Sequence, residues 1–73
     1  AMDYGVVLFY TTSMALKAEK RLKAAALDVK LIPTPRQFSS DCGFALRFGW
    51  ADRRRVEDLL AESGVETAGL YPL

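Results

Sequence analysis

The segment PTPRQFSSDCG, residues 33–43, contains the only cysteine of the chain, Cys42. Two hydroxyl residues and a carboxylate precede this cysteine and a glycine follows it, whereas a cysteine with only a packing role would sit among apolar residues. The chain has no histidine, which removes the commonest general base, the commonest metal ligand and any Cys-His dyad. Any chemistry therefore runs through the Cys42 thiol and its neighbours, and we expect neither a metal site nor a cofactor.

The neighbours of Cys42 include groups that would favour its reactive form. A cysteine reacts as its thiolate, and at an unperturbed pKa of about 8.5 little of it is ionised at neutral pH. Arg36 is the nearest cation in the sequence, and the loop is long enough for it to fold back toward the thiol. The amides around Gly43 offer a small anion-binding nest, since glycine takes the left-handed conformation that a nest requires. We expect both to lower the pKa of Cys42.

Asp41 opposes this activation, because a carboxylate beside a thiol disfavours the thiolate. Ser39 and Ser40 can engage Asp41 in local hydrogen bonds, and we expect them to do so. Ser-Ser-Asp before a strand is also ordinary turn chemistry, and Pro-x-Pro-Arg is often a stiff connector. Eleven residues nevertheless exceed the usual two to five of a hairpin loop, and long loops in compact domains tend to be functional or disordered. Phe38 and the two prolines favour order.

Length and composition indicate one small domain over residues 2–73. The chain has 73 residues, of which 51% are hydrophobic, and this favours a folded core over disorder. A net charge of +1 gives no excess of the kind that drives nucleic-acid binding. No apolar run approaches the ~20 residues of a membrane span, and no secretory signal is recognisable. We expect a cytoplasmic protein with a reduced thiol, and we expect Ala1, which precedes Met2, to be an addition to the natural chain.

Hydrophobic spacing predicts four strands and two helices. In chain order these are a strand from Gly5 to Tyr10, a helix ending near Ala26, strands from Val29 to Ile32 and from Phe44 to Phe48, a helix capped by Asp52 and stopped by Gly64, and a strand from Val65 to Tyr71. Leu22 and Leu59 are expected at the centres of the two apolar helix stripes. The order β-α-β-β-α-β is the ferredoxin-like pattern, a four-stranded antiparallel sheet with two helices on one face.

The usual strand order of this pattern, 4-1-3-2, places the first and third strands side by side. We expect these two strands to be parallel, so that Cys42 lies at the end of the sheet where both begin. Both helices would then present their C-termini there, and this dipole disfavours a thiolate. Val7, Phe9, Ala45 and Tyr71 are expected on the face that the helices leave bare, where an apolar patch would favour a homodimer.

Three motifs together resemble the small bacterial domains known as selenium/sulfur carrier-like proteins. They are ALKAEKRL at residues 15–22, VKLIPTPR at 29–36 and SSDCG at 39–43. The likeness covers nearly the whole chain. The P-x-P-R and S-S-x-C-G motifs are specific in combination, whereas the helices alone would match many α+β domains.

The resemblance implies a carrier that holds sulfur or selenium as a persulfide or perselenide on Cys42, with Arg36 and the Ser39–Ser40 loop around it. It also implies a donor, such as a cysteine desulfurase, and an acceptor protein. One cysteine is enough for carriage because the partners supply the other reacting groups, whereas a self-contained dithiol oxidoreductase needs two. Whether the chain is an enzyme stays open.

Two other readings remain. The first is a non-catalytic interaction or small-anion-binding module that uses Arg36 and backbone amides, with Cys42 incidental. The second is a thiol redox sensor. It is less favoured than the carrier and the interaction module, because no cluster of basic residues flanks the thiol.

Overall fold

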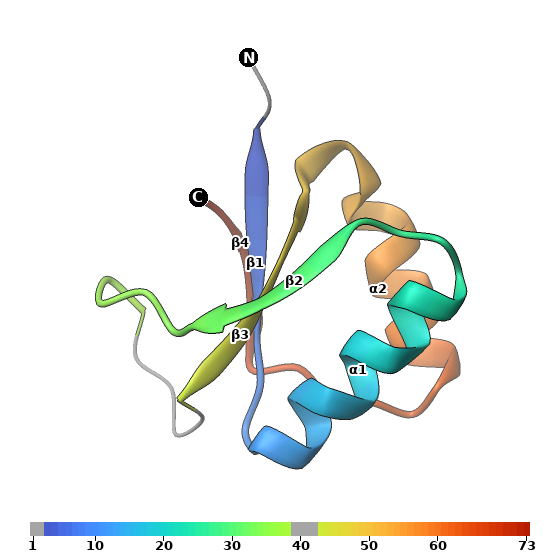
Figure 1. The fold of residues 1–73 in the computed structure, drawn as a ribbon, viewed down its shortest axis with the longest axis horizontal. Helices are drawn as coiled ribbons and strands as arrows, with labels where there is room; N and C mark the ends of the chain where they lie inside the picture. The colour runs from blue at the N-terminus through green and yellow to red at the C-terminus, as the bar shows by residue number, and fades with distance from the viewer. Residues whose placement is uncertain (1–2, 39–42) are drawn as a thin grey trace.

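The computed structural model describes residues 3–38 and 43–73. Its elements, in chain order, are β1 (Tyr4–Leu8), α1 (Thr12–Ala24), β2 (Val29–Pro33), β3 (Phe44–Gly49), the 3-10 turn η1 (Trp50–Asp52), α2 (Arg53–Glu62) and β4 (Gly69–Pro72). The strands form one antiparallel sheet, and Figure 1 shows both helices on one side of it. The expected α+β architecture, consistent with a ferredoxin-like arrangement, is confirmed.

Local chemistry explains where the first helix begins and ends. The Thr11 hydroxyl accepts a hydrogen bond from the amide of Met14 at 3.2 Å, which caps α1. The chain leaves α1 through Ala26, whose φ of 62° is left-handed, while the Leu27 amide donates to the Leu22 carbonyl. The second helix begins after Asp52 as expected, but the Asp52 side chain makes no capping hydrogen bond. The first strand is shorter than expected and ends at Leu8.

The strand order β2-β3-β1-β4 is the expected one, but the expected direction of β3 is wrong. β1 and β3 are antiparallel, with Leu8 opposite Ala45. The reason is topological: a helical crossover leaves β2 parallel to β1, and the turn into β3 then reverses the direction. The start of β3 therefore lies beside the end of β1, where α1 begins (Figure 1). We expected the C-termini of both helices at this end of the sheet. Only α2 ends there, whereas α1 begins there with its N-terminus.

The main core lies between the sheet and the helices. Its buried residues come from both helices, from alternate strand positions and from the turns between them: Val7, Phe9, Ala15, Ala18, Leu22, Leu27, Val29, Leu46, Phe48, Val56, Leu60 and Val65. Leu22 is fully buried, as expected for the centre of a stripe. In α2 the deeply buried leucine is Leu60, whereas Leu59 is only partly buried and packs on the margin of the core.

A smaller cluster lies on the opposite side of the sheet, which we call the open face. The open-face cluster consists of Val6, Leu8 and Ala45. All three side chains are buried although no helix covers them. Ile32, Phe38 and Ala68 pack against the cluster, so a loop residue supplies part of the cover that helices supply on the other side.

Of the four residues expected on the open face, two lie there and two do not. Val7 and Phe9 belong to the helix-side core, where they meet α1 and α2 residues. Ala45 does lie on the open face, and Tyr71 shares it because Tyr71 is the register partner of Val6. The error follows from the two-residue period of a strand, in which shifting the assignment by one position exchanges the faces.

Candidate functional site

The β2–β3 loop, residues 34–43, is closed at its base by the last pairing of the hairpin. Pro33 lies opposite Phe44 in the register, and the Thr34 amide donates a hydrogen bond to the Gly43 carbonyl at 3.0 Å. Pro33 has no amide hydrogen to give to the ladder, so the bond from Thr34 is the one that closes this end. Gly43, the residue that follows Cys42 in sequence, is thus tied to β2.

Phe38 fixes the loop at a second point. Its amide donates to the Pro35 carbonyl at 3.0 Å, which makes a turn over the Arg36–Gln37 pair. Its ring stacks on Tyr71 with centroids 5.1 Å apart and planes 19° from parallel. Tyr71 belongs to β4, at the far edge of the sheet from β2. The described residues 34–38 therefore extend over the open face, and Figure 1 shows them on the side of the sheet opposite the helices.

The structure places two of the predicted site residues. Arg36 is exposed in the turn, and it forms no ion pair within the part of the chain that the structure describes. Gly43 is exposed, and a side chain at this position would meet nothing within 4 Å. Ser39, Ser40, Asp41 and Cys42 lie outside the described residues. The activation of Cys42 by Arg36 and the Gly43 nest thus stays a prediction.

Sequence reasoning missed the partnership of Phe38 with Tyr71. One signal was present, because Phe38 is the only aromatic residue in an otherwise polar loop, and a ring at such a position usually has something to pack on. Its partner could not be named, since Tyr71 is 33 positions away in sequence and reaches Phe38 only because β4 pairs with β1.

The sequence matches one family model, described as "Putative Se/S carrier protein-like", over residues 4–72. The match includes both strands that flank the loop and all of the SSDCG motif. The chain belongs to this family. No curated protein and no solved structure matches the sequence.

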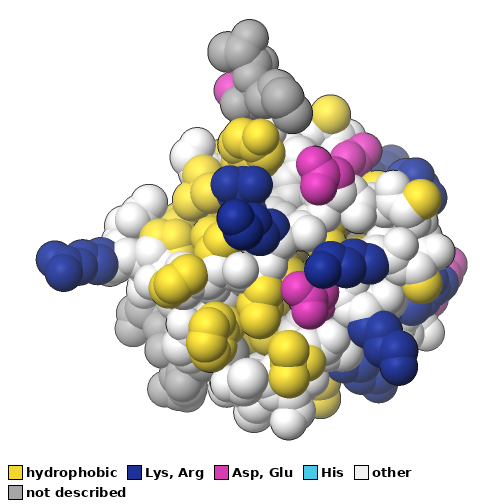
Figure 2. Space-filling view, in the orientation of Figure 1, with side chains coloured by type: hydrophobic (Ala, Val, Ile, Leu, Met, Phe, Trp, Pro, Cys, Tyr) yellow, Lys and Arg dark blue, Asp and Glu magenta, His cyan; other side chains and the backbone are white. Residues whose placement is uncertain are grey.

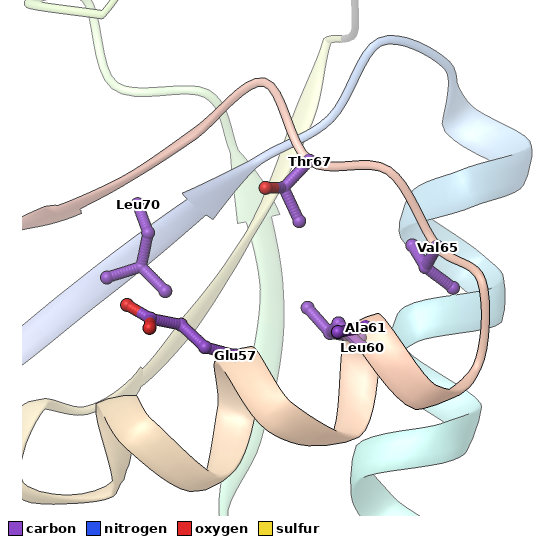
Figure 3. Close-up of a pocket in the computed structure, with 6 residues that line it drawn as sticks. All are labelled: Glu57, Leu60, Ala61, Val65, Thr67 and Leu70. Atoms are coloured by element: carbon purple, nitrogen blue, oxygen red, sulfur yellow. The ribbon is translucent and has the colours of Figure 1, made fainter.

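A pocket elsewhere in this Se/S carrier-like fold does not belong to the loop. It has a volume of about 220 Å³ and lies between α2 and β4, as Figure 3 shows. Its lining consists of Glu57, Leu60, Ala61, Val65, Thr67 and Leu70. Leu70 is the register partner of Val7 in the helix-side core, so the pocket and the β2–β3 loop lie on opposite sides of the sheet.

Two further searches bear on the site. Within residues 3–38 and 43–73, no three Cys, Asp or Glu side chains gather in a way that could hold a metal ion. In the same ranges, neither helix has the length and apolar character needed to cross a membrane.

Proposed function

We propose that this Se/S carrier-like protein holds a sulfur or selenium atom on Cys42 and passes it between partner proteins. The observation that carries the proposal is the family match over residues 4–72, which includes the loop with the chain's single cysteine. The loop geometry supports it. The residues on either side of the SSDC segment are held in place, Phe38 by its stack on Tyr71 and Gly43 by the hydrogen bond from Thr34. Arg36 is exposed in the turn before Phe38.

The transfer needs no oxidant, because the sulfur is already at the sulfane level in the donor. The Cys42 thiolate attacks the terminal sulfur of a donor persulfide, a new S–S bond forms on Cys42, and the donor's S–S bond breaks. The electron pair of the broken bond leaves with the donor thiolate. An acceptor thiolate then takes the same sulfur from Cys42 by the reverse exchange. A perselenide would be transferred in the same way.

Intact-mass measurement tests this function. The reduced chain is incubated with a cysteine desulfurase and free cysteine, and we expect a mass gain of one sulfur atom that dithiothreitol removes. Cys42→Ser is the matched control and should gain nothing. A parent chain that stays unmodified with several desulfurases, and with selenocysteine as the substrate, would contradict the carrier role.

The alternative is an interaction module in which Cys42 is idle, and one observation favours it. Phe38 covers apolar side chains of the sheet, so the loop has a structural reason to be long even without any chemistry. The two readings differ in the mass experiment, because only the carrier predicts a reducible sulfur on Cys42.

A homodimer through the open face is also a proposal. Phe38 reduces the apolar surface that this face offers, but Tyr71 and Leu73 at the β4 edge remain exposed by 43% and 51%. We expect light scattering at high micromolar concentration to report a dimer. A clean monomer under these conditions would show that the cover supplied by the loop is sufficient.

A further inference from the structure

Two cations lie directly opposite one another on the open face. Lys30 of β2 and Arg47 of β3 are register partners, and the same row continues through Val6 to Tyr71. Partners in a register project to the same side of the sheet. Lys30 and Arg47, which we call the cation pair, therefore share a face with the β2–β3 loop.

This arrangement is unfavourable for the isolated sheet. Like charges directly opposite one another on neighbouring strands repel and lower the stability of the pairing. Neither cation forms an ion pair with any residue that the structure describes; Asp28, the carboxylate nearest to Lys30 in sequence, is exposed and unpaired as well. Within residues 3–38 and 43–73 no carboxylate compensates for this repulsion, and an uncompensated charge pair on an exposed face is a candidate contact for another molecule.

Arg47 is held in place by an aromatic ring. Its guanidinium carbon lies 4.5 Å from the centroid of the Tyr4 ring, a cation–π contact that fixes the side chain without neutralising its charge. Arg47 is half-buried while Lys30 is exposed. Arginine and tyrosine are, with tryptophan, the residue types enriched among the residues that dominate binding at protein interfaces. A side chain that is already held in place also loses less entropy on binding.

Other cations of the chain lie on the two helices, where Lys17, Lys20, Arg21 and Lys23 belong to α1. Arg53, Arg54 and Arg55 form the first turn of α2, on the helix side of the sheet. Arg53 lies over Trp50, with its guanidinium carbon 5.2 Å from the ring centroid. Figure 2 shows Lys and Arg side chains spread over several parts of the visible surface. Of these groups, the cation pair is the one that shares a sheet face with the loop.

We propose that Lys30 and Arg47 form a docking surface for carboxylate side chains of a partner protein. The inference rests on the proposed carrier function, which requires donor and acceptor proteins to approach the loop. Two neighbouring carboxylates on a partner would relieve the repulsion between Lys30 and Arg47, and each could accept hydrogen bonds from one of the cations. The partner would thereby be oriented over the open face, beside the β2–β3 loop.

A peptide titration followed by NMR tests the surface without any thiol chemistry. The full chain, labelled with ¹⁵N and kept reduced, is titrated with a hexaglutamate peptide at low ionic strength. We expect the largest amide shifts at Lys30, Arg47 and their strand neighbours. Raising the salt to about 0.15 M should shrink these shifts, because the screening length then falls to about 8 Å.

Variants identify the charge that matters. Lys30→Glu should weaken peptide binding by about fivefold or more, the size expected for reversing one charge at an exposed interface position. Lys20→Glu makes the same change in charge on the exposed face of α1 and should leave the affinity within about twofold. Arg47→Lys keeps the charge but loses the planar fork that stacks on Tyr4, and should weaken binding less than Lys30→Glu does.

Three results would overturn the proposal: shifts concentrated on Arg53–Arg55 or on the lysines of α1, equal losses for the variants at positions 30 and 20, and no peptide shifts at low salt. The carrier function fails separately, by the absence of a mass gain on Cys42. A chain that gains sulfur but shows one of those three results would retain the carrier role and lose this docking surface.

Discussion

The two faces of the sheet are covered in different ways. On one face, α1 and α2 bury a continuous core that includes Phe9, Phe48 and Leu22. On the other, the three residues of the open-face cluster are covered in part by one ring from a loop, Phe38, which itself rests on Tyr71 at the edge of the sheet. A cover with few buried contacts opens at a lower free energy than a packed helix does. We therefore expect the open face to rearrange at a lower free energy than the helix side of the sheet.

The largest loss of stability is expected from a truncation in the helix-side core. Leu22→Ala removes a fully buried side chain and should lower the free energy of unfolding by about 2 to 5 kcal/mol, since truncation leaves a cavity that the packed helices cannot close. In a domain of this size that is a large part of the total stability. Chemical denaturation measures the loss, and a value below about 1 kcal/mol would mean that α1 is less tightly packed than its burial indicates.

Leu59→Ala and Leu60→Ala form a matched pair on α2. Leu60 is buried and Leu59 is only partly buried, so the second variant should cost more than the first, by at least about 1 kcal/mol. Equal losses would contradict the difference in burial, and a larger loss for Leu59→Ala would centre the apolar stripe of α2 on Leu59, as the sequence alone suggested.

Phe38→Ala tests the cover of the open face. It removes the stack on Tyr71 and part of the cover over Val6, Leu8 and Ala45, and should cost about 1 to 2 kcal/mol, less than a core truncation because the ring is partly exposed already. The NMR signals of Tyr71 should move, because a neighbouring ring no longer shifts them, while the methyl signals of Leu22 should stay in place.

Phe38→Leu is the control for this change. Leucine keeps much of the apolar cover but cannot stack, so it should lose less stability than alanine and still alter the Tyr71 signals. If Leu22 methyl signals moved as much as those of Tyr71, the two faces would be one cooperative unit, and the contrast between them would fail.

Periodicity predicted the element order and the helix-side position of Leu22, because these depend on short-range apolar spacing. The strand order came from the usual order of the ferredoxin-like pattern. The face predicted for Val7 and Phe9 was wrong, since a run that is apolar at every position carries no alternation from which to assign the face. The direction of β3 was missed for another reason: it follows from counting reversals along the chain, and no residue type signals it. The stack of Phe38 on Tyr71 depends on β1 and β4 pairing across the sheet, which local sequence does not record.

The smallest expected effect concerns the Cys42 thiol and tests whether Arg36 raises its reactivity. Arg36 is exposed and unpaired among the described residues, so its charge is free to act on an anion near the loop, but screening by solvent keeps the action weak. Arg36→Ala should slow the alkylation of Cys42 at neutral pH by about two- to threefold, because less of the thiol is ionised without the cation. Asp41→Asn should have the opposite effect and speed the reaction modestly, since it removes a like charge from beside the thiolate.

Lys17→Ala, on the exposed face of α1, is the control for a general loss of positive charge and should change little. Alkylation rates followed against pH for the parent and the three variants separate these effects from changes in access, because access alters the rate at every pH alike. If Arg36→Ala and Lys17→Ala reacted as the parent does, Arg36 would have no role in activation, and the loop would offer Cys42 to partners without raising its reactivity.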